Sequence, residues 1–295
     1  MTATLRCLLV ATVALAACER RTPPVPPPPA APASRPAAAS APAPQALLSA
    51  AKGEVEVKRG AAWQRLAAGS RLDRDDVIRT AGGSAATVSI EDIEVQLQAS
   101  TEVSLRELTA TASRVRLERG RLGASVASDR VVLKVESSGS SAVAEARRGR
   151  FAVFTDGKGL VAVTATAGEV KLASSGGDAL LGAGERAVVV KDAAPHREAV
   201  PASVFLKVKW PEVATNAKAV VVRGRADIGA AVAINGQPAE VGADGTFTAT
   251  VAVARGPNDL EVVATDLGGR SAAARGVVQV QRSAPRIEVE KPVWK

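Results

Sequence analysis

Apolar and polar residues alternate along most of the stretch from residue 53 to residue 190. In an extended chain, for example, Val115 and Leu117 fall on one face, and Arg114 and Arg116 fall on the opposite face. Gly, Asp and Ser clusters separate the alternating runs, and no run keeps a helical period. This pattern predicts half-buried antiparallel strands. The predicted strands are 53–60, 76–80, 84–90, 93–97, 102–108, 113–120, 121–126, 130–135, 141–146, 150–154, 160–165, 168–173 and 185–190.

Two of these runs nearly repeat each other. Residues 53–57 read GEVEV, and residues 168–172 read GEVKL. We expect them to form equivalent strands at opposite ends of one domain.

A second series of short alternating runs begins at residue 219. The dipeptides Asn235-Gly236 and Asp244-Gly245 lie between such runs, and they supply the positive φ values that tight hairpins need. About six or seven short strands in this length is the density of a β-sandwich. The series therefore predicts a second all-β domain.

Composition supports strands and limits the core. Aromatic residues make up 2% of the chain, there is no Tyr, and there is one His. The cores must therefore be built from Val, Ile, Leu and Ala, and frequent Val with Gly favours strands and turns. The predicted fold is all-β, with two β-sandwich-like domains after a disordered linker rich in Pro and Ala. The predicted boundaries are a signal segment at 1–18, the linker at 19–51, a first domain at 52–192, a linker at 193–203, a second domain at 204–281 and a tail at 282–295.

The first 18 residues have the layout of a signal peptide. Arg6 is followed by an apolar run from Cys7 to Leu15 and then by small residues. The run is shorter than the about 20 apolar residues that a spanning helix needs. The segment Leu15-Ala16-Ala17-Cys18 resembles the lipobox of bacterial lipoproteins, which implies cleavage before Cys18 and lipidation of its thiol. The alternative is an ordinary secretory signal with an incidental cysteine.

The segment 22–45 cannot form a core, because prolines remove backbone donors and the remainder is mostly Ala and Ser. As polyproline II it would reach roughly 70 Å at most. We expect it to be a stalk.

The net charge of +8 is compatible with an anionic partner. Export argues against nucleic acid and leaves anionic envelope polymers or lipid headgroups as candidates. The candidate contact for an anionic polymer is the arginine series Arg114, Arg116, Arg119 and Arg121. The alternative is a solvated sheet face in which Glu118 is interspersed.

The sequence predicts no catalytic, cofactor-binding or metal site. The single histidine, His196, lies in a predicted linker, so a His-based triad or a zinc cluster cannot be assembled. Asp73, Asp75 and Asp76 are close together but lack the spacing of a calcium loop. We therefore expect a protein that is not an enzyme and needs no cofactor.

The first domain carries short motifs whose order and spacing are more specific than any one motif. They are Gly53-Glu54-Val55, Arg59-Gly60, Trp63, Leu66, Gly69, Asp76-Val77-Ile78-Arg79-Thr80, Gly83-Ser84-Ala85-Ala86, Leu105, Gly120-Arg121-Leu122, Gly149-Arg150-Phe151-Ala152-Val153, Val163, Gly168-Glu169-Val170 and Gly182-Ala183-Gly184-Glu185. In these motifs the domain resembles the ferric-citrate regulator (FecR) family. The family usually has Gly where this chain has Ile93 and Thr where it has Arg150, which affects local turns rather than the fold.

The second domain resembles a bacterial immunoglobulin-like (Ig-like) module of the glucodextranase B-domain kind. The matching residues are Gly224, Val232-Ala233-Ile234-Asn235-Gly236, Asp244-Gly245-Thr246-Phe247, Gly256-Pro257-Asn258, Ala264-Thr265-Asp266 and Gly268. The resemblance implies a spacing or adhesion role, with Phe247 in the core and Asn258 in a turn.

Together these features predict a non-enzymatic cell-envelope lipoprotein that presents two β-domains to envelope proteins or anionic envelope polymers. A lipid anchor would attach it to a membrane, the outer rather than the inner, with its domains in the periplasm or at the cell surface. The alternative is a sensor component of a FecR-type signalling system that contacts a transporter or a separate membrane regulator. Well-known family members relay such signals through a spanning helix and a cytoplasmic segment, which a cleaved signal would not leave. The third class, a hydrolase, has no supporting motif.

Overall fold

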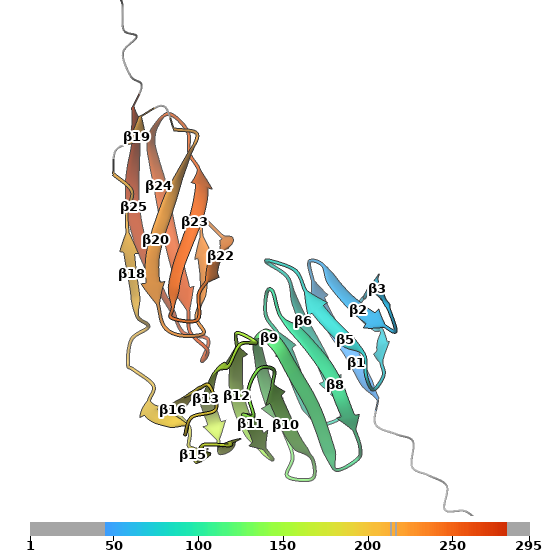
Figure 1. Ribbon diagram of the computed structural model, residues 1–295. Helices are drawn as coiled ribbons and strands as arrows, with labels where there is room; N and C mark the ends of the chain where they lie inside the picture. The colour runs from blue at the N-terminus through green and yellow to red at the C-terminus, as the bar shows by residue number, and fades with distance from the viewer. Residues whose placement is uncertain (1–44, 213, 216, 282–295) are drawn as a thin grey trace, which may run out of the picture. The chain divides into compact units, whose positions relative to one another are not determined.

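The computed structural model describes residues 45–212, 214–215 and 217–281. The predictions for the signal segment 1–18, including lipidation of Cys18, for linker residues 19–44 and for the tail 282–295 lie outside these residues. The described part consists of strands, turns and loops, as the alternating pattern predicts (Figure 1). In that part no helix has the length and apolar character needed to cross a membrane.

The first domain contains 17 strands in two sheets. Sheet A has the order β4-β1-β6-β7-β9-β12-β13-β16-β17, and sheet B has the order β3-β2-β5-β8-β9-β10-β11-β14-β15. The strands are β1 (Ala46–Lys52), β2 (Val55–Arg59), β3 (Ala62–Arg65), β4 (Arg71–Leu72), β5 (Val77–Thr80), β6 (Ala85–Ile90), β7 (Ile93–Leu97), β8 (Glu102–Leu108), β9 (Ala112–Val126), β10 (Val132–Ser137), β11 (Val143–Ala146), β12 (Gly149–Thr155), β13 (Leu160–Gly168), β14 (Val170–Ser174), β15 (Gly177–Leu181), β16 (Glu185–Val190) and β17 (His196–Ala199).

Strand β9 belongs to both sheets. Its first half pairs with β8 and β10 in sheet B, and its second half pairs with β7 and β12 in sheet A. The change occurs at Gly120, whose φ is +94°. A Cβ at this position would lie 2.6 Å from Thr101 Oγ1 and 2.7 Å from the Ser100 carbonyl oxygen. Only glycine fits here without strain, because the site combines a positive φ with a close backbone contact. The sequence predicted two strands, 113–120 and 121–126, and the structure joins them.

One apolar core lies between the two sheets. Its residues are Val, Ile, Leu and Ala with Phe151, the kind of core that the composition predicts. Along β9 the buried residues are Val115, Leu117, Leu122 and Ala124, so the inward face continues across Gly120. The predicted equivalence of 53–57 and 168–172 is confirmed, because β2 and β14 are each second from an edge of sheet B, at opposite ends.

Two predicted linkers are partly wrong. Residues 46–51, assigned to the disordered linker, lie in β1, which pairs with β4 and β6. Only Ala46 and Leu48 of this strand are buried, and a bulge follows Leu48, so the chain shows too little alternation to predict a strand. In the linker 193–203, His196 begins β17, which pairs with β16. This edge strand is held by backbone hydrogen bonds and buries none of its side chains fully, so no apolar pattern marks it.

The second domain contains eight strands. One sheet has the order β18-β20-β23-β22, and the other has the order β22-β21-β24-β25-β19. The strands are β18 (Leu206–Lys209), β19 (Ala214–Thr215), β20 (Ala219–Ala226), β21 (Ala231–Ile234), β22 (Gln237–Val241), β23 (Thr246–Ala252), β24 (Gly256–Thr265) and β25 (Ser271–Gln281).

The turn predictions for this domain are confirmed. Asn235 and Gly236 have φ values of 49° and 78° in the hairpin between β21 and β22, and Gly245 has a φ of 79° before β23. Phe247 is 2% exposed in the core, as expected. Asn258 lies in β24 rather than in a turn, but its side chain hydrogen-bonds both the N–H and the carbonyl of Ala254 and so closes the preceding loop.

Candidate functional site

The four arginines of the predicted anionic contact all lie on β9, but they do not form one surface. Arg114 and Arg116 project from the outer face of sheet B, opposite the buried Val115 and Leu117. Arg121 follows Gly120 and therefore lies on the part of β9 that belongs to sheet A. The change of sheet thus separates Arg121 from the others.

Neighbouring strands supply carboxylates to the arginines on sheet B. Arg114 lies 3.1 Å from Glu136 Oε1 on β10 and 3.5 Å from Glu107 Oε2 on β8. Both glutamates come from strands that flank β9, so the pairing depends on strand register.

The remaining two arginines before Gly120 also have carboxylate partners, Glu118 on β9 itself and Glu102 on β8. Arg116 Nε lies 3.6 Å from Glu118 Oε1, and Arg119 Nη2 lies 3.4 Å from Glu102 Oε2. Such partly exposed pairs contribute at most about 1 kcal/mol each. Their effect here is to balance the charge of the surface. This arrangement favours the alternative of a solvated face with interspersed glutamates over a platform for an anionic polymer.

Arg121 has no such partner. Its backbone is fixed by Thr101, whose hydroxyl accepts from the Arg121 N–H at 3.0 Å and donates to the Arg121 carbonyl at 3.0 Å. The side chain is mostly buried, and no carboxylate of the described residues lies within ion-pair distance of it. Nε and Nη1 are both buried without a hydrogen-bond partner in the described part of the chain. Burial lowers the pKa of the guanidinium to about 10.

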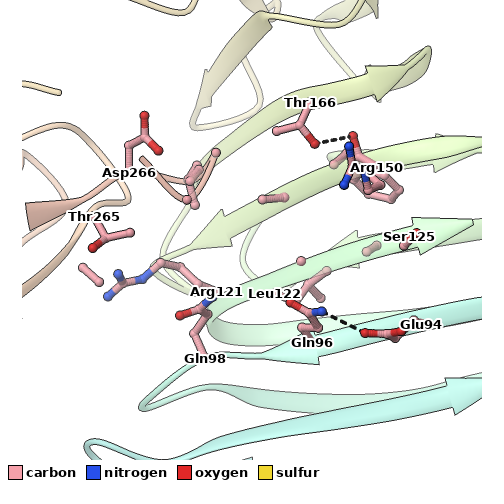
Figure 2. A pocket seen from close by; sticks show the side chains of 18 residues that line it. Glu94, Gln96, Gln98, Arg121, Leu122, Ser125, Arg150, Thr166, Thr265 and Asp266 are labelled. Atoms are coloured by element: carbon pink, nitrogen blue, oxygen red, sulfur yellow. Dashed lines mark hydrogen bonds between the residues drawn. The ribbon is translucent and has the colours of Figure 1, made fainter. Parts of the chain in front are cut away.

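A cavity of about 260 Å³ lies beside Arg121 on the outer face of sheet A. Figure 2 shows Arg121 in this cavity with Gln96 of β7 and Gln98, just after β7, on one side and Thr265 on the other. The polar residues that line it from sheet A are Glu94, Gln96, Gln98, Arg121, Ser125, Arg150 and Thr166. The turn between β24 and β25, residues 265–269, forms the remaining wall.

The two carboxylates in the lining are already engaged. Glu94 Oε1 accepts a hydrogen bond of 2.8 Å from Gln96. Asp266 accepts from Arg270 at 2.6 and 2.9 Å, and its side chain is 8% exposed. These two carboxylates therefore form hydrogen bonds within the cavity walls, and neither of them pairs with Arg121.

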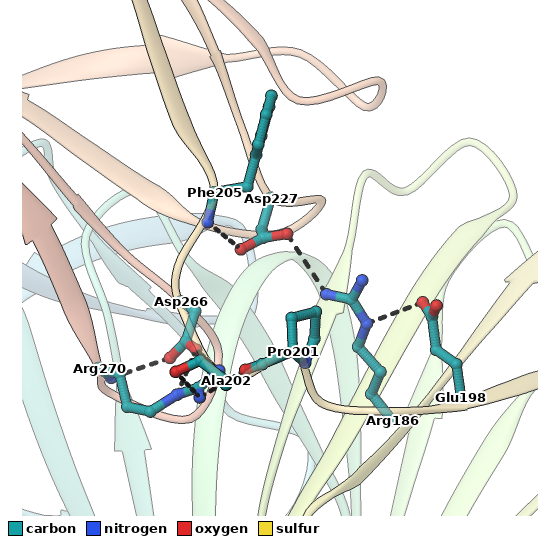
Figure 3. Close-up of polar contacts among 8 residues, drawn as sticks. All are labelled: Arg186, Glu198, Pro201, Ala202, Phe205, Asp227, Asp266 and Arg270. Atoms are coloured by element: carbon teal, nitrogen blue, oxygen red, sulfur yellow. Dashed lines mark hydrogen bonds and ion pairs between the residues drawn. The ribbon is translucent and has the colours of Figure 1, made fainter.

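Polar and apolar contacts between the two domains fix the position of residues 265–269, which form the wall contributed by the second domain (Figure 3). Arg186 on β16 lies 2.8 Å from Glu198 on β17 and 3.5 Å from Asp227 of the second domain. Asp227 also accepts from the Phe205 N–H at 2.9 Å. A small apolar cluster adds to this contact, with Phe154, Leu160, Ala162 and Val188 from the first domain and Ile228 and Leu267 from the second.

The other chemically suggestive residues serve the fold. Asp76 accepts from Arg59 Nη2 and from the Asp73 N–H, each at 3.0 Å, and thereby closes the turn before β5. His196 is exposed on β17. Within the described ranges no three His, Cys, Asp or Glu side chains come together as a metal site would require.

Comparison with protein families accounts for both domains. The family model "FecR protein" matches residues 76–171, and the model "Glucodextranase, domain B" matches residues 206–282. Both matches agree with the resemblances found in the sequence. No curated protein matches the chain.

Among solved structures, two crystal structures from Parabacteroides distasonis, of a protein provisionally called an anti-sigma factor, overlap the chain at 22% and 21% identity. Each overlap covers 42% of this chain and 59% of the other, with a TM-score of 0.38. A polysaccharide lyase overlaps 79% of this chain, over 40% of its own length, at 11% identity and a TM-score of 0.21. The chain spans little more than half of the first two structures.

Proposed function

We propose that this chain, which carries a FecR domain and a glucodextranase-type domain B, is a non-enzymatic binding module of the cell envelope. The observation that supports it best is the uncompensated Arg121 beside a cavity on the FecR domain. Such a group costs stability unless something binds it. The FecR family is regulatory, and domain B is an Ig-like domain rather than a catalytic one, so both family matches fit a binding role.

The envelope location rests on the first 18 residues. Their signal layout and the lipobox-like sequence before Cys18 support export, cleavage and lipidation at that cysteine. Two or three acyl chains would make the attachment durable, and the Pro-rich segment that follows would hold the domains away from the membrane.

Mass spectrometry of the mature protein tests the anchor. We expect a chain that begins at Cys18 and carries a diacylglycerol, and we expect Cys18→Ser to move the protein from the membrane fraction to the soluble fraction. An unmodified thiol or an uncleaved start would contradict the anchor.

Crosslinking in living cells, with Cys18 intact, tests the binding role. Peptidoglycan, lipopolysaccharide or other envelope lipoproteins among the crosslinked material would support it. Material that contains none of these, and no membrane regulator, would argue against an envelope binding role.

The second candidate is a component of FecR-type signalling. It is favoured by the FecR family match itself, which covers residues 76–171 and so includes the whole of β9. In this role the domain would contact a transporter or a separate membrane regulator. Crosslinking distinguishes the two, because recovery of a receptor or an inner-membrane regulator would assign the protein to signalling, with the Ig-like domain as a spacer.

A further inference from the structure

The outer face of sheet A contains a cation that the fold does not compensate. Arg121 Nε and Nη1 are buried without a hydrogen bond in the described part of the chain, as are Arg114 Nε and Arg116 Nε. Arg114, Arg116 and Arg119, however, each lie within 3.6 Å of a glutamate, whereas no carboxylate of the described residues pairs with Arg121. All four residues come from one strand. The difference therefore lies in what surrounds them. The cavity that Arg114 borders also contains its partners Glu107 and Glu136, whereas no carboxylate pairs with Arg121 in the cavity that it borders.

The cavity has the size and lining of a site for a small polar group. At about 260 Å³ it lies just below the roughly 300–1,000 Å³ of pockets that take drug-sized ligands, so it suits a single ring. Gln96, Gln98, Ser125 and Thr166 supply amides and hydroxyls that donate and accept hydrogen bonds. These groups match the alternating hydroxyls of a sugar.

We propose that this cavity binds a sugar ring that carries a carboxylate, with the carboxylate paired to Arg121. A planar guanidinium binds a carboxylate through two parallel hydrogen bonds, which would satisfy the donors that are now unpaired. One buried cation balances one carboxylate. Arg150, the other arginine of the lining, is exposed and therefore screened by solvent. The inference rests on the proposed binding function and names its ligand class.

The position of the cavity favours a sugar over a peptide. Strands β7, β9, β12 and β13 beneath it are each paired on both sides within sheet A, so their backbone groups are already used. A peptide that binds as an added strand needs a free sheet edge. A ligand on this face must therefore be bound by side chains, which can form hydrogen bonds with the hydroxyls of a sugar ring.

Isothermal titration calorimetry on the full chain tests the proposal with three probes: an oligomer of glucuronic acid, the matching glucose oligomer and a tetraglutamate peptide. We expect the glucuronic acid oligomer to bind at least tenfold more tightly than either of the others. Arg121→Met should weaken that binding at least tenfold, because a charge-assisted pair is lost. Arg121→Lys should retain part of it, since it keeps the charge but not the paired geometry.

Arg116→Met is the matched control, because it removes the same side chain from the same strand at a position paired with Glu118. The affinity of Arg116→Met for the glucuronic acid oligomer should stay within twofold of that of the unmodified chain. Absence of glucuronic acid binding, equal binding by Arg121→Met, or tighter binding of the glucose oligomer or tetraglutamate would each overturn the proposal. Crosslinking of Arg121→Met in cells separates this proposal from the proposed function. If calorimetry gives one of these contrary results but Arg121→Met still crosslinks to envelope partners, the envelope binding role stands and only the sugar site is wrong.

Discussion

Replacing Arg121 by methionine should make the protein more stable. Methionine keeps an unbranched chain of similar length and removes a buried charge whose Nε and Nη1 have no partner in the described part of the chain. Burial lowers the Arg121 pKa from its ordinary value to about 10, and at about 1.36 kcal/mol per pKa unit this puts the charged form at a disadvantage of about 3 kcal/mol. Arg121 is not fully buried, so solvent screening relieves part of this disadvantage. We therefore expect a gain of about 1–3 kcal/mol in the free energy of unfolding.

The gain in the free energy of unfolding of Arg121→Met should also become smaller at high pH. Below pH 10 the folded protein carries the charged Arg121, and the whole disadvantage is present. As the pH rises above about 10, the folded state releases this proton while the unfolded state still keeps it, so the unmodified protein becomes more stable relative to the variant. The difference between the two should therefore shrink above pH 10.

Scanning calorimetry of the full chain measures this difference at pH 7 and at pH 10.5. A gain of 1 kcal/mol corresponds to a rise of roughly 2–4 °C in Tm for a domain of this size. Arg116→Met removes one of the two ion pairs of Glu118, whose other partner Arg106 stays at 3.9 Å, and should instead lose up to about 1 kcal/mol. A Tm for Arg121→Met equal to or below that of the unmodified chain would refute the reasoning, because it would mean that the folded protein already compensates the charge.

Three further outcomes follow from the structure. Gly120→Ala should lower the free energy of unfolding, measured with denaturant, by at least about 2 kcal/mol, because its Cβ would lie 2.6 Å from a side-chain oxygen. Gly60→Ala is the control: no atom lies within 4 Å of its Cβ, so only its positive φ should cost stability, about 1 kcal/mol. Asp192→Asn should lower Tm at pH 7, because hydrogen bonds from the Ser141 N–H and from the hydroxyls of Ser140 and Ser141 lower the Asp192 pKa. This stabilisation is lost as the pH falls through the lowered pKa, so the loss in Tm should shrink toward acid pH; a loss that stays constant would contradict this. Arg186→Met should speed proteolysis between the domains, because it leaves Asp227 without its cation; an unchanged cleavage rate would mean that the apolar contacts suffice.

Much of the fold was predictable because alternation carries the information. Every predicted strand between residues 53 and 190 is present, because buried and exposed positions alternate along most of these strands between turn residues. The strands that were missed, β1, β3, β4, β15 and β17, lack this signal. In β1 a bulge interrupts the pattern, and β4 has only two residues. β3 and β17 bury no side chain fully, and in β15 only Leu181 is buried.

The candidate site was less predictable, because it depends on pairings between distant segments. Period 2 placed Arg114, Arg116 and Arg121 on β9 correctly but could not show that Gly120 moves the last of them to another sheet. The carboxylates that balance Arg114 come from β8 and β10, and the wall opposite Arg121 comes from residues 265–269. Only tertiary structure shows which arginine stays unpaired.

The sharing of β9 by both sheets has a consequence for how the first domain folds. Neither sheet is complete until residues 112–126 are in place, and β9 pairs with four other strands, of which β10 and β12 follow it in the chain. Contacts between segments so far apart slow folding, because loop-closure entropy is lost before the contacts form. A chain truncated at residue 111 would expose unpaired edges of β7 and β8 and so invite aggregation. The domain should therefore form as one cooperative unit, with no stable half that could serve as an intermediate.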